Sequence, residues 1–189
     1  MNHEHDADWT HGPDPDSGLD SEDVLIEPAT SDDVTTVAED WIDLASEQLV
    51  YGSHVLPDAN HDVILDVLSA YRFNDGLLVA RVGDDIVGFA TFSLERGSFD
   101  LDTTRGLLSN LFVKPHVRNR GVGTSLLEAA EHSLAESGAS VVVLEAMAAN
   151  ESARRFYRRH GYETYRVGME RTLEQTAQEE NDTHSKEDR

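Results

Sequence analysis

Residues 111–131 read LFVKPHVRNRGVGTSLLEAAE, and this stretch decides what kind of fold the chain can form. It opens with apolar residues that stop at Pro115, which is typical of a strand and its end. Two arginines and two glycines then lead into apolar residues at helical spacing, namely Val122, Leu126, Ala129, Ala130 and Leu134. A strand, a glycine-rich turn and a helix in this order predict an α/β arrangement with the turn at one end of a sheet.

The turn itself has the features of an anion site. Gly121 and Gly123 permit backbone conformations closed to other residues and let a ligand approach the main chain. The helix that follows begins with unpaired N–H groups, which commonly bind phosphate. Arg118 and Arg120 add charge suited to phosphate oxygens. Neither the GxxxxGK[ST] loop nor GxGxxG is present, and a glycine pair alone also fits a plain flexible helix start.

The remaining patterns predict one α/β domain with a mixed sheet. The helix after residue 31 is expected to be capped by Thr30 or Ser31, and the apolar run of residues 140–146 is expected to be a central strand buried on both faces. Strands are predicted at residues 24–30, 76–95 (a hairpin turning at 83–85), 106–115, 140–146 and 164–173, and helices from about residue 31 to 48, 60 to 71, 122 to 137 and 150 to 161.

Composition limits the domain plan and the class of partner. Residues 1–22 and 174–189 are polar without hydrophobic period, so disordered tails are expected to flank a domain at 23–173. The net charge of -22 is scattered along the chain, which favours a halophilic protein in a salt-rich cytoplasm, with an acidic interaction surface as the second explanation. It disfavours nucleic-acid binding, because phosphate contacts need basic patches.

Two further absences in the sequence shape the expectations. There are no cysteines among the 189 residues, so disulfides and thiolate metal sites are excluded, and no metal is expected. No apolar run is long enough to cross a bilayer, and the first residues lack the basic and apolar regions of a signal peptide. We therefore expect a cytoplasmic protein that does not bind membranes.

Two motifs resemble those of one enzyme family. Residues 111–131 resemble motif A of the GNAT superfamily of acetyl-coenzyme A-dependent N-acetyltransferases, whose R/Q-x-x-G-x-G/A signature is matched by Arg118, Gly121 and Gly123. Residues 150–163, NESARRFYRRHGYE, resemble its motif B, N-x-x-A-x-x-F-Y-x-x-x-G-F/Y. The two motifs stand in the family's order with an apolar strand between them, and the resemblance covers roughly residues 24–173.

The resemblance implies how the acyl donor binds. It implies a splayed mixed sheet whose fourth and fifth strands part to admit the pantetheine arm of acetyl-coenzyme A. Main-chain groups of the fourth strand would pair with that arm, the glycine-rich turn would hold the pyrophosphate, and the asparagine of motif B would hydrogen-bond the cofactor. The implied residues are Leu111, Phe112, Val113, Arg118, Asn119, Arg120, Gly121, Val122, Gly123, Thr124 and Asn150.

The resemblance also implies catalytic roles. Tyr157 matches the tyrosine that protonates the departing coenzyme A thiolate; its helical spacing alone favours a core residue, and the motif match reverses that preference. The oxyanion donor would be a backbone N–H near Leu111 or Phe112. Glu145 is our candidate general base, with Glu95 as the alternative; because LLSNLFV contains no acid, a water chain or an amine that arrives neutral is a further option.

The sequence thus predicts an N-acetyltransferase in which a primary amine attacks acetyl-coenzyme A directly in a ternary complex. The acceptor is a protein amino terminus, a lysine or a small-molecule amine, and the residues at 51–60 and 96–104 are expected to select it. The alternative is a non-catalytic module that binds acyl-coenzyme A for regulation or interaction. A homodimer is left open.

Overall fold

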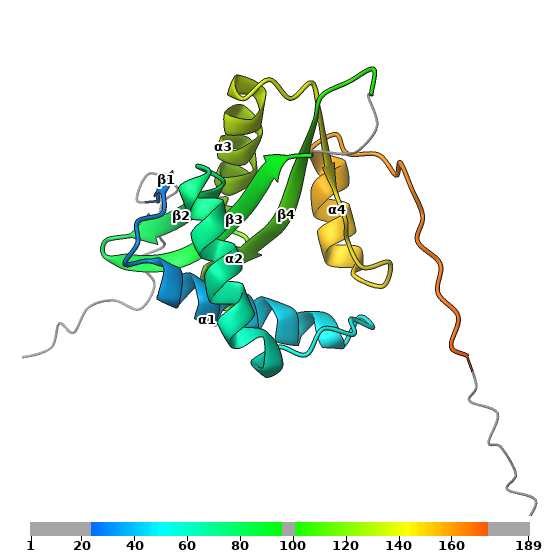
Figure 1. The fold of residues 1–189 in the computed structure, drawn as a ribbon, viewed down its shortest axis with the longest axis horizontal. Helices are drawn as coiled ribbons and strands as arrows, with labels where there is room; N and C mark the ends of the chain where they lie inside the picture. Colours follow the sequence, from blue (N-terminus) through cyan, green and yellow to red (C-terminus); the bar gives the residue numbers. More distant parts are fainter. Residues whose placement is uncertain (1–23, 96–100, 174–189) are drawn as a thin grey trace, which may run out of the picture.

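The computed structural model describes residues 24–95 and 101–173, so the two predicted tails lie outside the described residues, as does part of the connection before the fourth strand. Figure 1 shows a sheet with helices on both sides. The elements are β1 Leu25–Pro28, α1 Val34–Leu49, η2 Asp58–Asn60, α2 His61–Phe73, β2 Leu77–Val82, β3 Asp85–Leu94, β4 Arg105–Val113, η3 Pro115–Val117, α3 Val122–Glu136, β5 Val141–Leu144 and α4 Glu151–Arg159.

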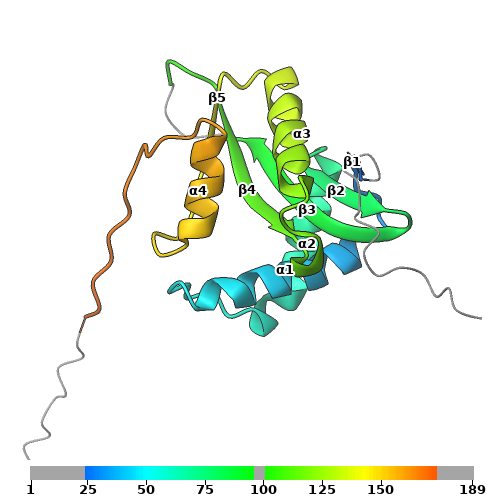
Figure 2. The same ribbon diagram turned by 180° about the vertical axis from the view of Figure 1, so that it is seen from behind.

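The five strands form one sheet in the order β1-β2-β3-β4-β5, antiparallel except for the parallel pair β4 and β5. The predicted mixed sheet is therefore confirmed. Helices α3 and α4 lie on one face, while α1 and α2 lie on the other (Figures 1 and 2). Each helix pair covers its own apolar cluster, because successive strand residues point to opposite faces.

Helix α3 approaches the sheet closely at Gly88 in β3. A Cβ placed on Gly88 would lie 2.6 Å from the carbonyl oxygen of Phe112 and 3.2 Å from a methyl group of Leu126. Leu126 is fully buried in the cluster between α3 and the sheet. Because Gly88 has no side chain, α3 can pack closely against the sheet at this point. This packing positions the turn before α3 near the end of β4.

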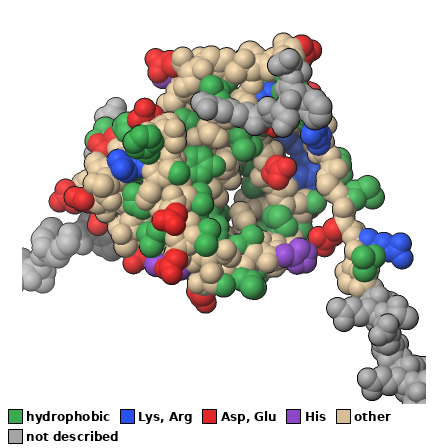
Figure 3. All heavy atoms as spheres, viewed as in Figure 1, with side chains coloured by type: hydrophobic (Ala, Val, Ile, Leu, Met, Phe, Trp, Pro, Cys, Tyr) green, Lys and Arg blue, Asp and Glu red, His purple; other side chains and the backbone are tan. Residues whose placement is uncertain are grey.

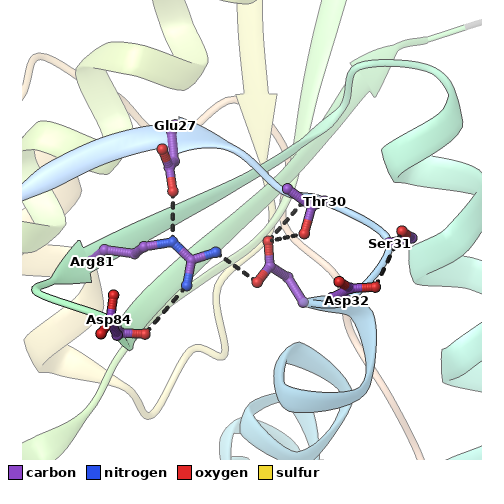
Figure 4. Close-up of polar contacts among 7 residues, drawn as sticks. Glu27, Thr30, Ser31, Asp32, Arg81 and Asp84 are labelled. Carbon is purple, nitrogen blue, oxygen red and sulfur yellow. Dashed lines mark hydrogen bonds and ion pairs between the residues drawn. The ribbon is translucent and has the colours of Figure 1, made fainter.

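The start of α1 differs from the prediction. Neither Thr30 nor Ser31 caps it; the preceding residue is Asp33, whose Oδ2 accepts hydrogen bonds from the backbone N–H (2.7 Å) and the hydroxyl (2.8 Å) of Thr30. The Oδ1 atom of Asp33 accepts from Arg81 Nη2 at 2.6 Å, and Arg81 Nε donates to Glu27 at 2.5 Å (Figure 4). The capping prediction failed because α1 begins only at Val34, and the carboxylate of the preceding Asp33 is taken by Thr30 and by Arg81, 48 residues away.

Two predictions about the end of the sheet are wrong. β5 is not central: in the described residues it pairs with β4 alone, and Val141 is 45% exposed. Residues 164–173, predicted as a strand, pair with no strand and run away from the body of the molecule (Figures 1 and 2). An apolar run shows only that a strand has hydrophobic side chains to bury, and it does not show how many strands lie beside it. In β5, Val142 and Leu144 pack in the apolar cluster with residues of α3 and α4.

Within the described ranges, no helix has both the length and the apolar character needed to cross a bilayer.

Candidate functional site

A gap opens between β4 and β5. The two strands pair only from Arg105 to Leu108 of β4, although β4 continues to Val113. Thr91 of β3 pairs with Asn110 and Phe92 with Leu108, which leaves Ser109 as an extra, bulged residue. Since a bulge bends its strand, β4 turns away from β5 after Leu108. The last five residues of β4 therefore present an edge that no strand of the described structure covers.

The hydrogen-bond pattern decides which backbone groups face this gap. The N–H of Lys114 donates to the carbonyl of Val87 in β3 at 2.9 Å. In an antiparallel pair, successive residues alternate between facing the partner strand and facing away from it. Phe112 therefore pairs with Phe89 in β3, whereas Leu111 and Val113 direct their N–H and C=O groups toward the gap. Of the three residues named from the sequence, Leu111 and Val113 have backbone groups available there.

The turn before α3 has the backbone of an anion-binding site. Asn119 (φ 63°) and Gly121 (φ 87°) adopt left-handed conformations, and no side chain caps the helix. The N–H groups of Val122, Gly123 and Thr124 are thus left without partners inside the helix. A Cβ on Gly123 would lie 3.6 Å from the ring of Phe156 and 3.7 Å from Val113, so these amides open where β4, α3 and α4 meet. Unpaired amides and the helix dipole together favour an anion.

The two arginines of the turn have different surroundings. Arg118 Nε donates to the carbonyl of Val113 at 2.7 Å, and its Nη2 lies 2.8 Å from both carboxylate oxygens of Glu47. Its guanidinium also lies 5.6 Å from the ring centre of Phe112. Arg118 therefore fastens the turn to α1 and β4, while Arg120 is exposed. No sequence pattern indicates Glu47 as a partner, because it lies 71 residues from Arg118.

Asn150 and His160 anchor the two ends of α4. The side-chain oxygen of Asn150 accepts from the N–H of Ala153 at 3.0 Å and caps the helix. At the other end, His160 Nε2 lies 3.2 Å from the hydroxyl of Thr124, and its Nδ1 lies 2.9 Å from the carbonyl of Phe156. The start of α3 is thereby held to the end of α4. A contact of Asn150 with a cofactor stays a prediction, and its amide nitrogen is the group that would make it.

Tyr157 is packed among aromatic rings at the edge of the apolar cluster that lies under α3. Its ring meets Phe156 edge-on at 5.2 Å and Tyr162 at 5.7 Å. Burial raises the pKa of Tyr157 to about 12, so the phenol is protonated at neutral pH and able to donate a proton. Burial first, and then the hydrogen bond to Glu131 at 2.7 Å, raise the pKa of Tyr162 as well.

The candidate bases differ in position. Glu145 follows directly after β5 and is exposed. Glu95 lies 2.9 Å from Arg105 Nε, and Arg105 pairs with Val141 at the closed end of the strand pair, far along β4 from the gap. This ion pair gives Glu95 a structural role.

Hydroxyl and amide groups line the bulged part of β4. The Ser109 hydroxyl lies 2.8 Å from that of Tyr71 on α2, and Asn110 Nδ2 donates to the buried hydroxyl of Thr91 at 2.7 Å. Sequence analysis missed Tyr71 and Thr91, because only the fold brings them to β4. The described residues contain no group of three or more metal-ligating side chains.

Comparison with known proteins agrees with this geometry. A model of the acetyltransferase (GNAT) family matches residues 39–162, which include the β4–β5 gap, the turn before α3 and all of α4. The chain belongs to the GNAT acetyltransferase family.

Among its relatives are N-acetyltransferases of uncharacterised function. The chain is 32% identical over 87 residues to YhfO of Bacillus subtilis and 34% identical over 86 residues to one from Archaeoglobus fulgidus. Each match covers 46% of this chain and 58% of the relative, so the chain spans less than two thirds of these proteins.

Solved structures cover more of the chain. A GCN5-related N-acetyltransferase from Ralstonia eutropha superposes with a TM-score of 0.63 and 25% identity, over 79% of this chain and 98% of the other. An aminoglycoside acetyltransferase from an uncultured soil metagenomic sample superposes with a TM-score of 0.59 and 21% identity, over 82% and 99%. The second likeness shows the fold alone.

Proposed function

We propose that the protein transfers an acetyl group from acetyl-coenzyme A to a primary amine, with both substrates bound at once. One observation carries the proposal: the uncovered edge of β4 ends beside the unpaired amides at the start of α3. A ligand with amide groups at one end and a diphosphate at the other matches that pair of features, and the matched family supports this ligand.

The residues present fit this ligand. The backbone groups of Leu111 and the N–H of Val113 would pair with the pantetheine amides as a neighbouring strand would. The amides of residues 122–124 would hold the pyrophosphate, with Arg120 adding charge from the exposed side. Arg118 supports the site indirectly, because it holds the turn against Val113 and Glu47.

The protein would lower the barrier chiefly by placing the two reactants together. Acetyl-coenzyme A supplies the acetyl thioester, and the amine would be bound beside it. Well-aligned reactants gain roughly 7–11 kcal/mol from such placement. The N–H of Leu111 is our candidate donor to the carbonyl oxygen as negative charge develops, and one such donor contributes about 3 kcal/mol.

Two proton transfers complete the reaction. The acceptor nitrogen attacks the carbonyl carbon as the neutral amine, so a cationic acceptor first gives one proton to solvent. The C–N bond then forms and the C–S bond breaks. The departing sulfur takes the phenol proton of Tyr157, which is protonated at neutral pH, and solvent then returns a proton to the phenolate. Burial raises the pKa of Tyr157 to about 12, so the phenolate does not persist. The nitrogen loses its proton to Glu145 or to water; since Glu145 is exposed, we propose that a water molecule relays this proton.

We propose a cationic amine as the acceptor, either a small molecule or a protein amino group. The net charge of -22 attracts such a substrate. One neighbour in fold is an aminoglycoside acetyltransferase, a protein that acts on an amine of this kind. A cytoplasmic location and adaptation to high salt stay predictions from composition.

Thiol release tests the activity directly. The protein is incubated with acetyl-coenzyme A and a panel of amines, and free thiol is followed while calorimetry measures coenzyme A binding in dilute and in saline buffer. Acceptor-dependent thiol release is expected. Tight binding without release would favour the non-catalytic acyl-coenzyme A module, and a folded protein that does not bind coenzyme A would refute both functions.

A further inference from the structure

Helix α1 presents two carboxylates to the segment that leads into the turn before α3. Asp40 and Glu47 lie about two helical turns apart in α1, which places them on the same side of the helix. The Oδ1 atom of Asp40 lies 3.2 Å from Lys114 Nζ, and both carboxylate oxygens of Glu47 lie 2.8 Å from Arg118 Nη2. Two ion pairs thus connect α1 to the two ends of residues 114–118.

Residues 114–118 join the uncovered edge of β4 to the turn before α3. Arg118 Nε donates to the carbonyl of Val113 at 2.7 Å, which fixes the far end of the segment to β4. Val117 is buried in the apolar cluster under α3, which fixes the middle of the segment. In both ribbon views α1 runs beneath the end of β4 and the start of α3 (Figures 1 and 2). The position of this segment therefore sets where the unpaired amides of residues 122–124 lie.

The carboxylate of Asp40 is buried at a cost in free energy. Its side chain is only 5% exposed, and its Oδ2 has no hydrogen-bond partner among the described residues. Burial raises the pKa of Asp40 above its usual value, although the contact with Lys114 acts to lower it. A buried ion pair of this kind contributes little to stability and can instead fix one arrangement of the chain.

The second ion pair is more exposed, but its guanidinium is held by further contacts. Exposed ion pairs contribute little to stability when both side chains are free to move. Arg118, however, is already oriented by its hydrogen bond to Val113 and by the ring of Phe112, whose centre lies 5.6 Å from the guanidinium. Glu47 therefore meets a fixed partner, and their contact sets the distance between α1 and the segment.

We propose that Asp40 and Glu47 are positioning residues for coenzyme A: through Lys114 and Arg118 they hold the turn before α3 in the form that receives the diphosphate. The inference rests on the acetyl transfer proposed above. A site that is formed before its ligand arrives does not have to be ordered on binding, and this raises affinity. Neither carboxylate touches the ligand.

The direction of the effect distinguishes positioning from general electrostatics. The chain carries a net charge of -22, and acidic side chains are spread over the face of the molecule shown in Figure 3. Coenzyme A is itself an anion, so removing an acidic side chain reduces repulsion and favours binding. A positioning role predicts the opposite: loss of the carboxylate of Asp40 or Glu47 weakens the binding of coenzyme A.

Calorimetry with coenzyme A and the full chain tests this direction. We expect Glu47→Gln to weaken coenzyme A binding about fivefold, because the turn loses its connection to α1. Glu39→Gln is the matched control, since it removes the same charge from an exposed position of the same helix and breaks neither ion pair. The affinity of Glu39→Gln should equal or slightly exceed that of the wild-type protein.

Two further variants separate positioning from stability. Because burial raises the pKa of Asp40, the folded protein holds the charged form less well than the unfolded chain does. Asp40→Asn should therefore not lower the thermal midpoint, and it should still weaken coenzyme A binding. The double variant of Glu47→Gln and Arg118→Met should bind coenzyme A no worse than Arg118→Met alone, because Glu47 acts through Arg118.

An acetyl donor without the diphosphate identifies the part of the site that is affected. With an acceptor from the amine panel, Glu47→Gln should lower kcat/KM for acetyl-coenzyme A about fivefold and leave kcat/KM for acetyl-pantetheine unchanged. Unchanged or tighter coenzyme A binding in Glu47→Gln and Asp40→Asn, or an equal loss with both donors, would overturn the inference alone. A folded wild-type protein that does not bind coenzyme A would overturn the proposed function and this inference with it.

Discussion

Tyr157 combines a packed ring with a phenol that stays protonated. We predict that Tyr157→Phe lowers turnover by about 100-fold or more, because the variant loses the proton donor. Coenzyme A affinity should stay unchanged, since phenylalanine keeps the ring contacts with Phe156 and Tyr162. Steady-state kinetics and calorimetry measure the two effects. Tyr162→Phe is the control: it removes a hydroxyl that bonds Glu131 and should leave turnover intact. Full activity in Tyr157→Phe would remove the assigned role.

Substitutions at Gly121 and Gly123 distinguish the effect of backbone strain from the effect of a lost ligand contact. Gly121 has φ 87°, so Gly121→Ala should both destabilise the fold, by about 1–2 kcal/mol, and weaken coenzyme A binding. At Gly123 a Cβ meets only ordinary contacts at 3.6 Å or more, so Gly123→Ala should fold normally. We predict that it nevertheless weakens coenzyme A binding about tenfold, or about 1.4 kcal/mol. Thermal unfolding and calorimetry test the pair; wild-type affinity in Gly123→Ala would place the diphosphate elsewhere.

At the scale of elements, the cluster around Arg81 joins β1, β2 and the start of α1 (Figure 4). Burial alone raises the pKa of Asp33, but hydrogen bonds from Arg81 and Thr30 outweigh it and lower the pKa below its usual value. A lowered folded-state pKa stabilises the fold above the unfolded value of about 3.9. This stabilisation is lost as the pH falls through the lower folded value.

We therefore predict that Asp33→Asn reduces the free energy of unfolding by about 1–3 kcal/mol at neutral pH. The difference in unfolding free energy from the wild-type protein should shrink as the pH falls below about 4. The unfolded wild-type carboxyl takes up a proton there, and the folded one does so only at a lower pH. Urea unfolding across pH measures both. Asp32→Asn is the control, since exposed Asp32 has only a 3.4 Å contact with Ser31. An equal loss of unfolding free energy in Asp33→Asn and Asp32→Asn would show that the ion pair between Asp33 and Arg81 does not stabilise the fold.

The helices and strands show which structural features can be predicted from local sequence patterns. The hairpin of β2 and β3, the strand at β4 and the helix α3 follow from alternation, glycine and helical spacing, which neighbouring residues encode. The apolar residues of α2 do not all face the core: Ile64 and Leu68 are buried, whereas Val63 and Val67 are 57% and 40% exposed. Spacing identifies a helix, but the width of its buried face depends on what packs against it.

For the whole molecule, the net charge of -22 sets the response to salt. Repulsion among like charges opposes the compact state, and salt screens it, to within about 3 Å at molar concentration. We predict that the thermal midpoint rises steadily from dilute to molar potassium chloride. Sucrose of equal osmolarity is the control for solute exclusion, which acts without screening. A midpoint that does not change with salt would contradict the interpretation of the acidic composition as a salt adaptation.

Patterns among neighbouring residues predicted the order of the elements up to α4, the glycine-rich turn before α3 and the motif that begins at Asn150, because each depends on residues close together in the chain. The remaining features of the site depend on tertiary contacts. The structure showed that Arg118 holds Glu47, that Leu111 and Val113 rather than Phe112 face the gap, and that β5 ends the sheet with a free edge. These features depend on sheet register and on partners tens of residues away, and no local pattern records which strand lies beside which.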